Sequence, residues 1–132
     1  MPNLDYWHCF HDGTITAAVG SVPGDVEFTI DCDYIREELH QSPGMFLLRV
    51  TNCTLLEIAP YDAELALDGI QALNSGEFDI LDADMDKDVV QVSNATGMMR
   101  LRYDFEVLML DDGTVISLRD LIDAANRSVG DL

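Results

Sequence analysis

Basic residues are scarce in this sequence. One lysine, Lys87, and six arginines stand against 25 acidic residues, and the formal net charge is −18 over 132 residues. Proteins that bind nucleic acid or anionic lipid need clustered Lys and Arg side chains to contact phosphates. We therefore exclude direct binding to DNA, RNA or an anionic membrane, and expect instead an attraction to cationic surfaces.

Long apolar runs and cysteine clusters are also missing. No apolar stretch approaches the ~20 residues that span a membrane, and the first residues lack the basic region and apolar stretch of a signal peptide. The three cysteines, Cys9, Cys32 and Cys53, are widely spaced and form no CxxC pair. Because an odd number of separate thiols suits a reducing compartment, we expect a cytoplasmic protein with no membrane partner.

The motifs that would mark an enzyme are absent as well. The sequence contains no GxSxG, Walker A or GxGxxG motif. Cys9 lies near His11, but a nucleophilic dyad also needs an orienting third group. None of the 18 aspartates is singled out as half of an acid/base pair. We predict no enzymatic activity and no cofactor, with acid/base catalysis left as an alternative.

The sequence does have enough apolar residues for a hydrophobic core. Hydrophobic residues make up 48% of the chain, which argues against the disorder that accompanies high charge and low hydrophobicity. We expect one domain over residues 1–132, with the acidic residues on its surface.

Alternation of apolar and polar residues predicts most of the fold. Val26 to Asp33 alternates without a fault, as a half-buried strand does. Three later segments alternate in the same way and are separated by short turns, which predicts an antiparallel meander. Two further strands are expected to form a hairpin that bends at Asn52. Besides Val26 to Asp33, the predicted strands are 45–51, 53–58, 81–86, 90–92 and 98–110.

Helical signals are fewer. Ser117 can cap a helix of about 117–127, whose apolar residues recur at helical spacing. Tyr34 to His40 is predicted to form a short helical turn, and helix is slightly favoured for 62–74. The predicted fold class is therefore α+β: an antiparallel meander sheet or partial barrel, with a short helix or two and a C-terminal amphipathic helix.

An acidic stripe is the first candidate site. Asp82, Asp84, Asp86 and Asp88 recur at every second residue, so on a strand they share one face at a spacing of roughly 6.8 Å. An EF-hand alignment fails, because Lys87 stands at the required glycine. We predict an extended surface for a basic protein partner, with Glu77 and Asp79 at its margin; a merely solvated strand face is the alternative.

The N-terminal segment offers a second, weaker candidate. His8, His11 and Asp12 are possible metal ligands, but a complete zinc or iron site needs three or four converging groups. We predict an aromatic-rich first strand with Trp7 and Phe10 in the core. On such a strand the side chains of His8 and His11 are expected to point to opposite sides. A divalent-metal protein is kept as an alternative function, and so is a structural protein whose acidity serves solubility.

The order of turn signals carries a resemblance. His11-Asp12-Gly13, Pro23-Gly24-Asp25, Tyr34-Ile35-Arg36 and Asp111-Asp112-Gly113 before a capped helix are similar to small, uncharacterised bacterial proteins, some of which are encoded beside polymorphic toxins. The resemblance implies an immunity-like role. Together with the charge, it leads us to expect a small acidic binding protein that docks a cationic partner such as a toxin. Whether the chain is a monomer or a homodimer is left open.

Overall fold

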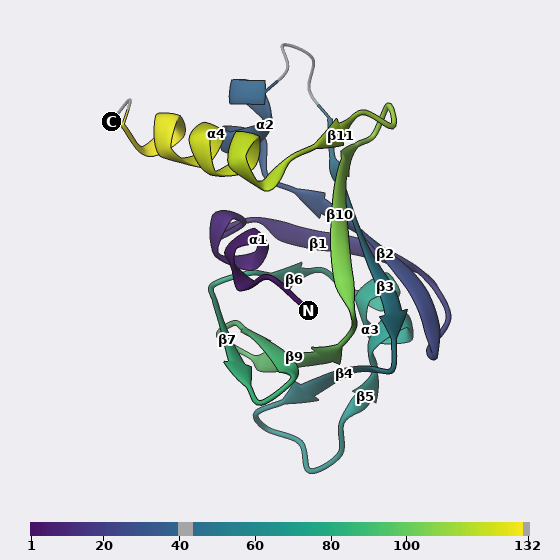
Figure 1. The fold of residues 1–132 in the computed structure, drawn as a ribbon. Helices are drawn as coiled ribbons and strands as arrows, with labels where there is room; N and C mark the ends of the chain where they lie inside the picture. The colour runs from purple at the N-terminus through teal and green to yellow at the C-terminus, as the bar shows by residue number, and fades with distance from the viewer. Residues whose placement is uncertain (40–43, 131–132) are drawn as a thin grey trace.

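The computed structural model describes residues 1–39 and 44–130. These residues form four helices and two antiparallel sheets, which confirms the predicted α+β class, and the described strands close no barrel (Figure 1). The helices are α1 (Leu4–Cys9), α2 (Asp33–Leu39), α3 (Gly69–Ser75) and α4 (Leu118–Gly130).

The larger sheet has six strands in the order β11-β10-β3-β2-β1-β6. The predicted strand at 26–33 corresponds to β2, and Val26, Phe28 and Ile30 are buried as expected. Strand β11 follows the turn at Asp111-Asp112-Gly113 and pairs with β10. The strands are β1 (Thr14–Gly20), β2 (Gly24–Asp31), β3 (Phe46–Cys53), β6 (Phe78–Asp79), β10 (Phe105–Leu110) and β11 (Val115–Ile116).

The smaller sheet has five strands in the order β5-β4-β9-β8-β7. Its last three strands form the predicted meander, with a turn at Lys87, whose φ is 58°, between β7 and β8. Strand β7 is an edge strand, so one side of its backbone has no strand partner within this sheet. The strands are β4 (Leu55–Pro60), β5 (Leu67–Asp68), β7 (Asp82–Asp86), β8 (Val89–Ser93) and β9 (Gly97–Arg102).

Two of the crossings that the chain makes between the sheets contradict the sequence prediction. The expected hairpin at Asn52 is wrong: β3 and β4 belong to different sheets, and Asn52 turns the chain with a φ of 53°. The expected strand 98–110 is broken at Asp104 into β9 and β10. The two crossings hold each other, because the Asp104 N–H donates to the Thr51 carbonyl at 2.9 Å and the Asn52 amide donates to the Asp104 carboxylate at 3.1 Å.

The break at Asp104 also changes which side chains are buried. An unbroken strand over 98–110 that buries Met99 and Leu101 would also turn Phe105, Val107 and Met109 inward. In the structure Leu108 and Leu110 are buried instead, and Phe105 is 49% exposed. The alternation shifts by one residue because β10 pairs with β3 in the other sheet and therefore presents its opposite face to the core.

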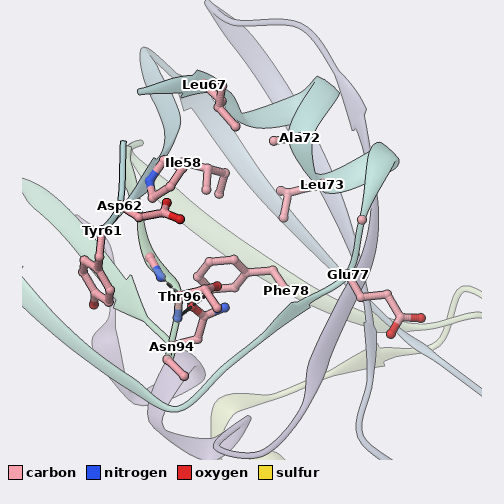
Figure 2. A pocket seen from close by; sticks show the side chains of 14 residues that line it. Ile58, Tyr61, Asp62, Leu67, Ala72, Leu73, Glu77, Phe78, Asn94 and Thr96 are labelled. Carbon is pink, nitrogen blue, oxygen red and sulfur yellow. Dashed lines mark hydrogen bonds between the residues drawn. The ribbon is translucent and has the colours of Figure 1, made fainter. Parts of the chain in front are cut away.

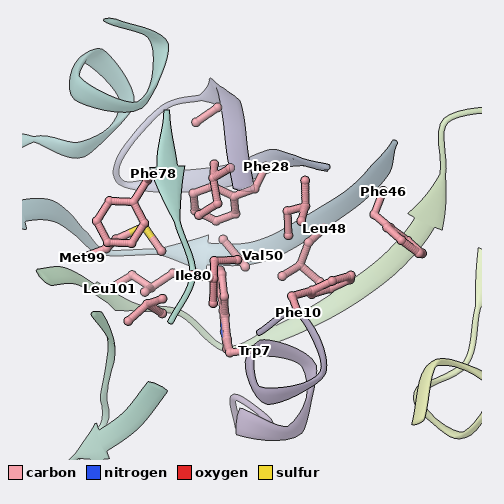
Figure 3. Packing of buried hydrophobic residues seen from close by; sticks show 14 of the residues in the cluster. Trp7, Phe10, Phe28, Phe46, Leu48, Val50, Phe78, Ile80, Met99 and Leu101 are labelled. Atoms are coloured by element: carbon pink, nitrogen blue, oxygen red, sulfur yellow. The ribbon is translucent and has the colours of Figure 1, made fainter. Parts of the chain in front are cut away.

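The N-terminal segment is helical, not the predicted strand. The Asn3 side chain accepts the Asp5 N–H at 3.0 Å and caps α1. Trp7 and Phe10, three residues apart, are both fully buried, as expected for the core (Figure 3). Their rings contact Phe28 and Phe46 edge-on, with centroids 5.8 and 5.0 Å apart. The helix forms because this face can enter the core.

The other helical predictions are confirmed where the structure describes them. Ser117 accepts the Asp120 N–H at 3.1 Å and caps α4, which buries Leu121 and Ala124. Helix α4 packs beside α2 at the end of the molecule away from the smaller sheet (Figure 1). The predicted helical turn 34–40 corresponds to α2, although its last residue, His40, lies outside the described residues.

The ambiguous segment 62–74 divides into β5 and α3. Asp68 caps α3 by accepting the Gln71 N–H at 3.1 Å. Gly69 lets the helix start against β4, because a Cβ there would lie 2.4 Å from the Leu56 Cγ. At the other end of α3, the Asn74 amide bonds the Ala18 N–H and carbonyl of β1, at 3.0 and 2.6 Å. Helix α3 is therefore attached to both sheets.

Candidate partner-binding surface

The predicted acidic stripe lies on the outer face of the smaller sheet. Asp82, Asp84 and Asp86 are exposed on β7, while Ala83 and Met85 between them point toward the core. We call these three aspartates the acidic strand. The alternation in the sequence therefore gave the correct face. The acidic strand lies on the last strand of the sheet.

Arginine pairing separates the fourth aspartate from the other three. Asp88 lies after the Lys87 turn and forms an ion pair with Arg102 at 3.0 Å. Arg100 pairs with Glu57 on β4 at 3.0 Å. Each of the six arginines pairs with an acidic residue outside the acidic strand. Within the described residues, the acidic strand has no ion pair. The arginine partners are Glu27, Glu38, Glu57, Asp88, Asp111 and Asp123.

Of the two marginal acids, Asp79 belongs to the larger sheet and Glu77 directly precedes its strand β6. Asp79 is on β6, where its carboxylate accepts the Thr14 hydroxyl at 2.9 Å. Glu77 precedes β6 and is exposed. The chain then runs through Ile80 and Leu81 into β7, so the edges of the two sheets meet here (Figure 1). Glu77, Asp79 and the acidic strand therefore follow one another along the chain at these neighbouring edges, and together we call them the acidic surface.

Sequence reasoning missed a groove beside these acids. It has a volume of about 450 Å³ and lies between α3, the turn 94–97 and the segment after β4 (Figure 2). Ile58, Leu73 and Phe78 contribute apolar side chains from the core. Asp62 and Glu77 line the groove as well. A smaller hollow, lined by Glu77, Asp79, Leu81 and the turn at 94–96, adjoins it and leads to the acidic strand.

One wall of the groove is fixed by local hydrogen bonds. The Asn94 side chain accepts the backbone N–H groups of Thr96 and Gly97, both at 2.9 Å. The Tyr61 N–H donates to the Thr96 carbonyl at 2.9 Å, which ties the far end of β4 to the same turn. Because an Asx turn and a cross-strand bond hold this wall, the groove is built into the fold.

The histidines at the N-terminus hold α1 against the acidic edge. The imidazole of His8 bonds the carbonyl of Ala83 at 2.8 Å, and that of His11 bonds the carbonyl of Leu81. The Ala83 N–H is bonded by the carboxylate of Asp82 at 2.8 Å. These bonds satisfy part of the unpaired side of β7 and shield it from further strand pairing.

This arrangement corrects the expected orientation of the two histidines. Because α1 is a helix, His8 and His11 turn toward the same strand, not to opposite sides. Asp12 contacts His11, with 3.4 Å between Nε2 and Oδ2, and both side chains are mostly exposed. Within residues 1–39 and 44–130, no group of three or more His, Cys, Asp or Glu side chains is placed to hold a metal ion.

The three thiols are poor nucleophiles. Burial raises the pKa of Cys9 to about 11, with the Asp5 carboxylate acting in the same direction. Burial also raises the pKa of Cys32 to about 11, and that of Cys53 above its ordinary value. All three are free of disulfides. Since the thiolate is the reactive form, these cysteines serve as small core residues.

Comparison with known proteins adds no family. No protein-family model, no curated protein and no solved structure matches this chain. In the part of the chain that the structure describes, no helix is both long and apolar enough to cross a membrane. The function must therefore be argued from the acidic surface and the groove beside it.

Proposed function

We propose that the protein binds a cationic protein partner through the acidic strand, with Glu77 and Asp79 at the margin of the contact. The observation that carries the proposal is the distribution of ion pairs. Each arginine pairs with an acid elsewhere, while Asp82, Asp84 and Asp86 are exposed side by side with no ion pair in the described chain. Complementary charge accelerates encounter and selects against anionic partners.

The resemblance to bacterial proteins encoded beside toxins suggests the class of partner. A nuclease holds phosphates in a basic groove, and a row of carboxylates at roughly 6.8 Å spacing can occupy such a groove in their place. We therefore propose inhibition of a toxin by occlusion as the biological role. Chemistry by the acidic strand itself is not part of the proposal.

The proposal can be tested by fluorescence anisotropy with a labelled peptide of lysine, arginine and serine residues. We call it the serine peptide. The stripe variant carries Asp82→Asn, Asp84→Asn and Asp86→Asn. We expect its dissociation constant for the serine peptide to rise about tenfold or more. Binding to the unmodified protein should weaken as salt rises, since exposed charges are screened over about 8 Å at physiological ionic strength.

The matched control removes the same charge elsewhere. Glu37→Gln, Asp120→Asn and Asp123→Asn neutralise three exposed acids on α2 and α4. The control variant should bind the serine peptide within about twofold of the unmodified protein, because local complementarity, rather than net charge, sets the contact. Equal losses in the two variants would show that the peptide responds only to total charge, and the proposal would be wrong.

A further inference from the structure

We propose that the groove of Figure 2 receives one large apolar side chain of the cationic partner, carried on an extended segment with basic residues on both sides of it. This inference rests on the proposed function and names the chemistry of the partner at the same surface. A phenylalanine, leucine or similar side chain is the expected anchor.

The lining of the groove suits an apolar anchor. Leu73 and Phe78, at 1% and 5% exposure, belong to the hydrophobic core, and the ring of Phe78 projects into the middle of the groove (Figure 2). The volume of about 450 Å³ falls within the range of about 300–1,000 Å³ that is usual for ligand clefts. An apolar side chain that displaces water from this lining gains the free energy of burial.

The entrance of the groove is unusually apolar for so charged a chain. Tyr61 and Leu67, which are 60% and 51% exposed, line the groove, and Leu65 between them in the sequence is 80% exposed. Exposed apolar residues beside a concave surface are typical of sites of protein contact. Segment 61–67 therefore extends the apolar contact beyond the groove itself.

Charge complementarity identifies what must flank the anchor. Asp62 and Glu77 line the groove, and Glu64 is exposed on the segment between Tyr61 and Leu65. No lysine or arginine is among the described residues that line either the groove or the adjoining hollow. From the hollow, Leu81 leads directly to Asp82 and the acidic strand. An anchor with basic neighbours meets carboxylates on both sides of the groove.

Two peptides of equal charge test the inference. The phenylalanine peptide is the serine peptide with its central serine replaced by phenylalanine. We expect the unmodified protein to bind the phenylalanine peptide about tenfold more tightly, as burial of one large apolar side chain allows. Isothermal titration calorimetry gives the affinities, and a more negative heat-capacity change for the phenylalanine peptide is expected from apolar burial.

Two variants fill the groove from opposite walls. Gly76 lines the groove with a φ of −168°, which any residue adopts, and a Cβ there meets no atom within 4 Å, so Gly76→Phe places a ring in open space. Ala95→Trp adds bulk on the exposed turn that forms the other wall. Ser75→Phe is the matched control, because Ser75 lies next to Gly76 but does not line the groove.

The outcomes separate the two proposals. Both groove variants should lose the tenfold preference for phenylalanine and keep their affinity for the serine peptide, while Ser75→Phe keeps both. If the unmodified protein binds both peptides equally, or if Gly76→Phe and Ala95→Trp retain the preference, the anchor site is refuted and the acidic surface stands. If the stripe variant and its charge-matched control bind the serine peptide alike, the proposed function itself is wrong.

Discussion

The carboxylates of β10 and those of β7 differ in what surrounds them. Glu106 at the start of β10 is half-buried, accepts the Tyr103 hydroxyl, and accepts the Asn3 N–H at 2.9 Å. On β7, Asp84 and Asp86 project from an exposed face, and the structure records no ion pair to either among its described residues. Glu106 contributes to folding, whereas the acidic strand is available to a partner. The role of an acid in this chain therefore depends on its neighbours and not on the total of −18.

The largest effect on stability should come from the hydrogen-bond chain around Glu106. Tyr103 is buried, accepts the Trp7 Nε1–H at 3.0 Å and donates to Glu106. Tyr103→Phe leaves the indole N–H without its acceptor in the core, which should lower the free energy of unfolding by about 1–3 kcal/mol. Urea denaturation measures this change in the free energy of unfolding. Tyr61→Phe, at a residue 60% exposed, is the control and should change little; equal effects would contradict the structural role of this chain of bonds.

An intermediate effect should appear in the dependence of stability on pH. Burial raises the pKa of Glu106 above its ordinary value, although its hydrogen bonds from Tyr103 and Asn3 oppose the shift. When folding raises the pKa of a carboxyl, that group contributes to the stability of the folded state at pH values below the ordinary carboxyl pKa. The contribution is lost as pH rises through the raised pKa. The free energy of unfolding of Glu106→Gln, relative to that of the unmodified protein, should therefore be higher at about pH 7 than at about pH 3.

Asp111, just after the other end of β10, should give the opposite trend. The Met45 N–H and then the Arg36 guanidinium hold the pKa of this carboxyl below its ordinary value. Its contribution to stability is present above the ordinary carboxyl range and is lost as pH falls through the lowered pKa. Asp111→Asn should therefore be most destabilising near neutral pH. If urea denaturation gives parallel pH profiles for Glu106→Gln and Asp111→Asn, the opposite roles assigned to the two carboxyls are wrong.

The smallest effect should come from the acidic strand. The stripe variant should change the free energy of unfolding by no more than about 0.5 kcal/mol, in the stabilising direction, because three neighbouring like charges are removed. Asn at position 82 retains an oxygen that can accept the Ala83 N–H. A loss of stability above about 1 kcal/mol would mean that these aspartates support the fold, and the contrast with Glu106 would disappear.

Local sequence patterns correctly predicted the elements for which the pattern allows only one arrangement of buried and exposed residues. The alternation of β2 and of β7 gave the buried and exposed faces, and Ser117 gave the start of α4. Segment 107–110 is apolar at every position, so its sequence is compatible with either face toward the core. The pairing of β10 with β3 decides between them, and that contact is not local.

One part of the candidate site, the acidic strand, could be predicted from the sequence, and the other part, the groove, could not. The acids at 82–86 could be placed on one strand face because their spacing is regular. The groove could not be predicted, since its lining comes from β4, the segment after it, α3, the residues around β6 and the turn 94–97. Its one sequence signal is the run from Tyr61 to Asp68, where apolar and acidic residues mix in a segment too short to form a core of its own.

The most direct test of the account is to locate the contact on the protein. Titration of the serine peptide into ¹⁵N-labelled protein, followed by amide chemical shifts, reports which backbone groups respond. The largest shifts should fall within residues 77–88 and the adjoining turn 94–97, with α2 and α4 unaffected. Shifts spread over all acidic surfaces, or centred on α2 and α4, would contradict the claim that the acidic strand is the binding surface.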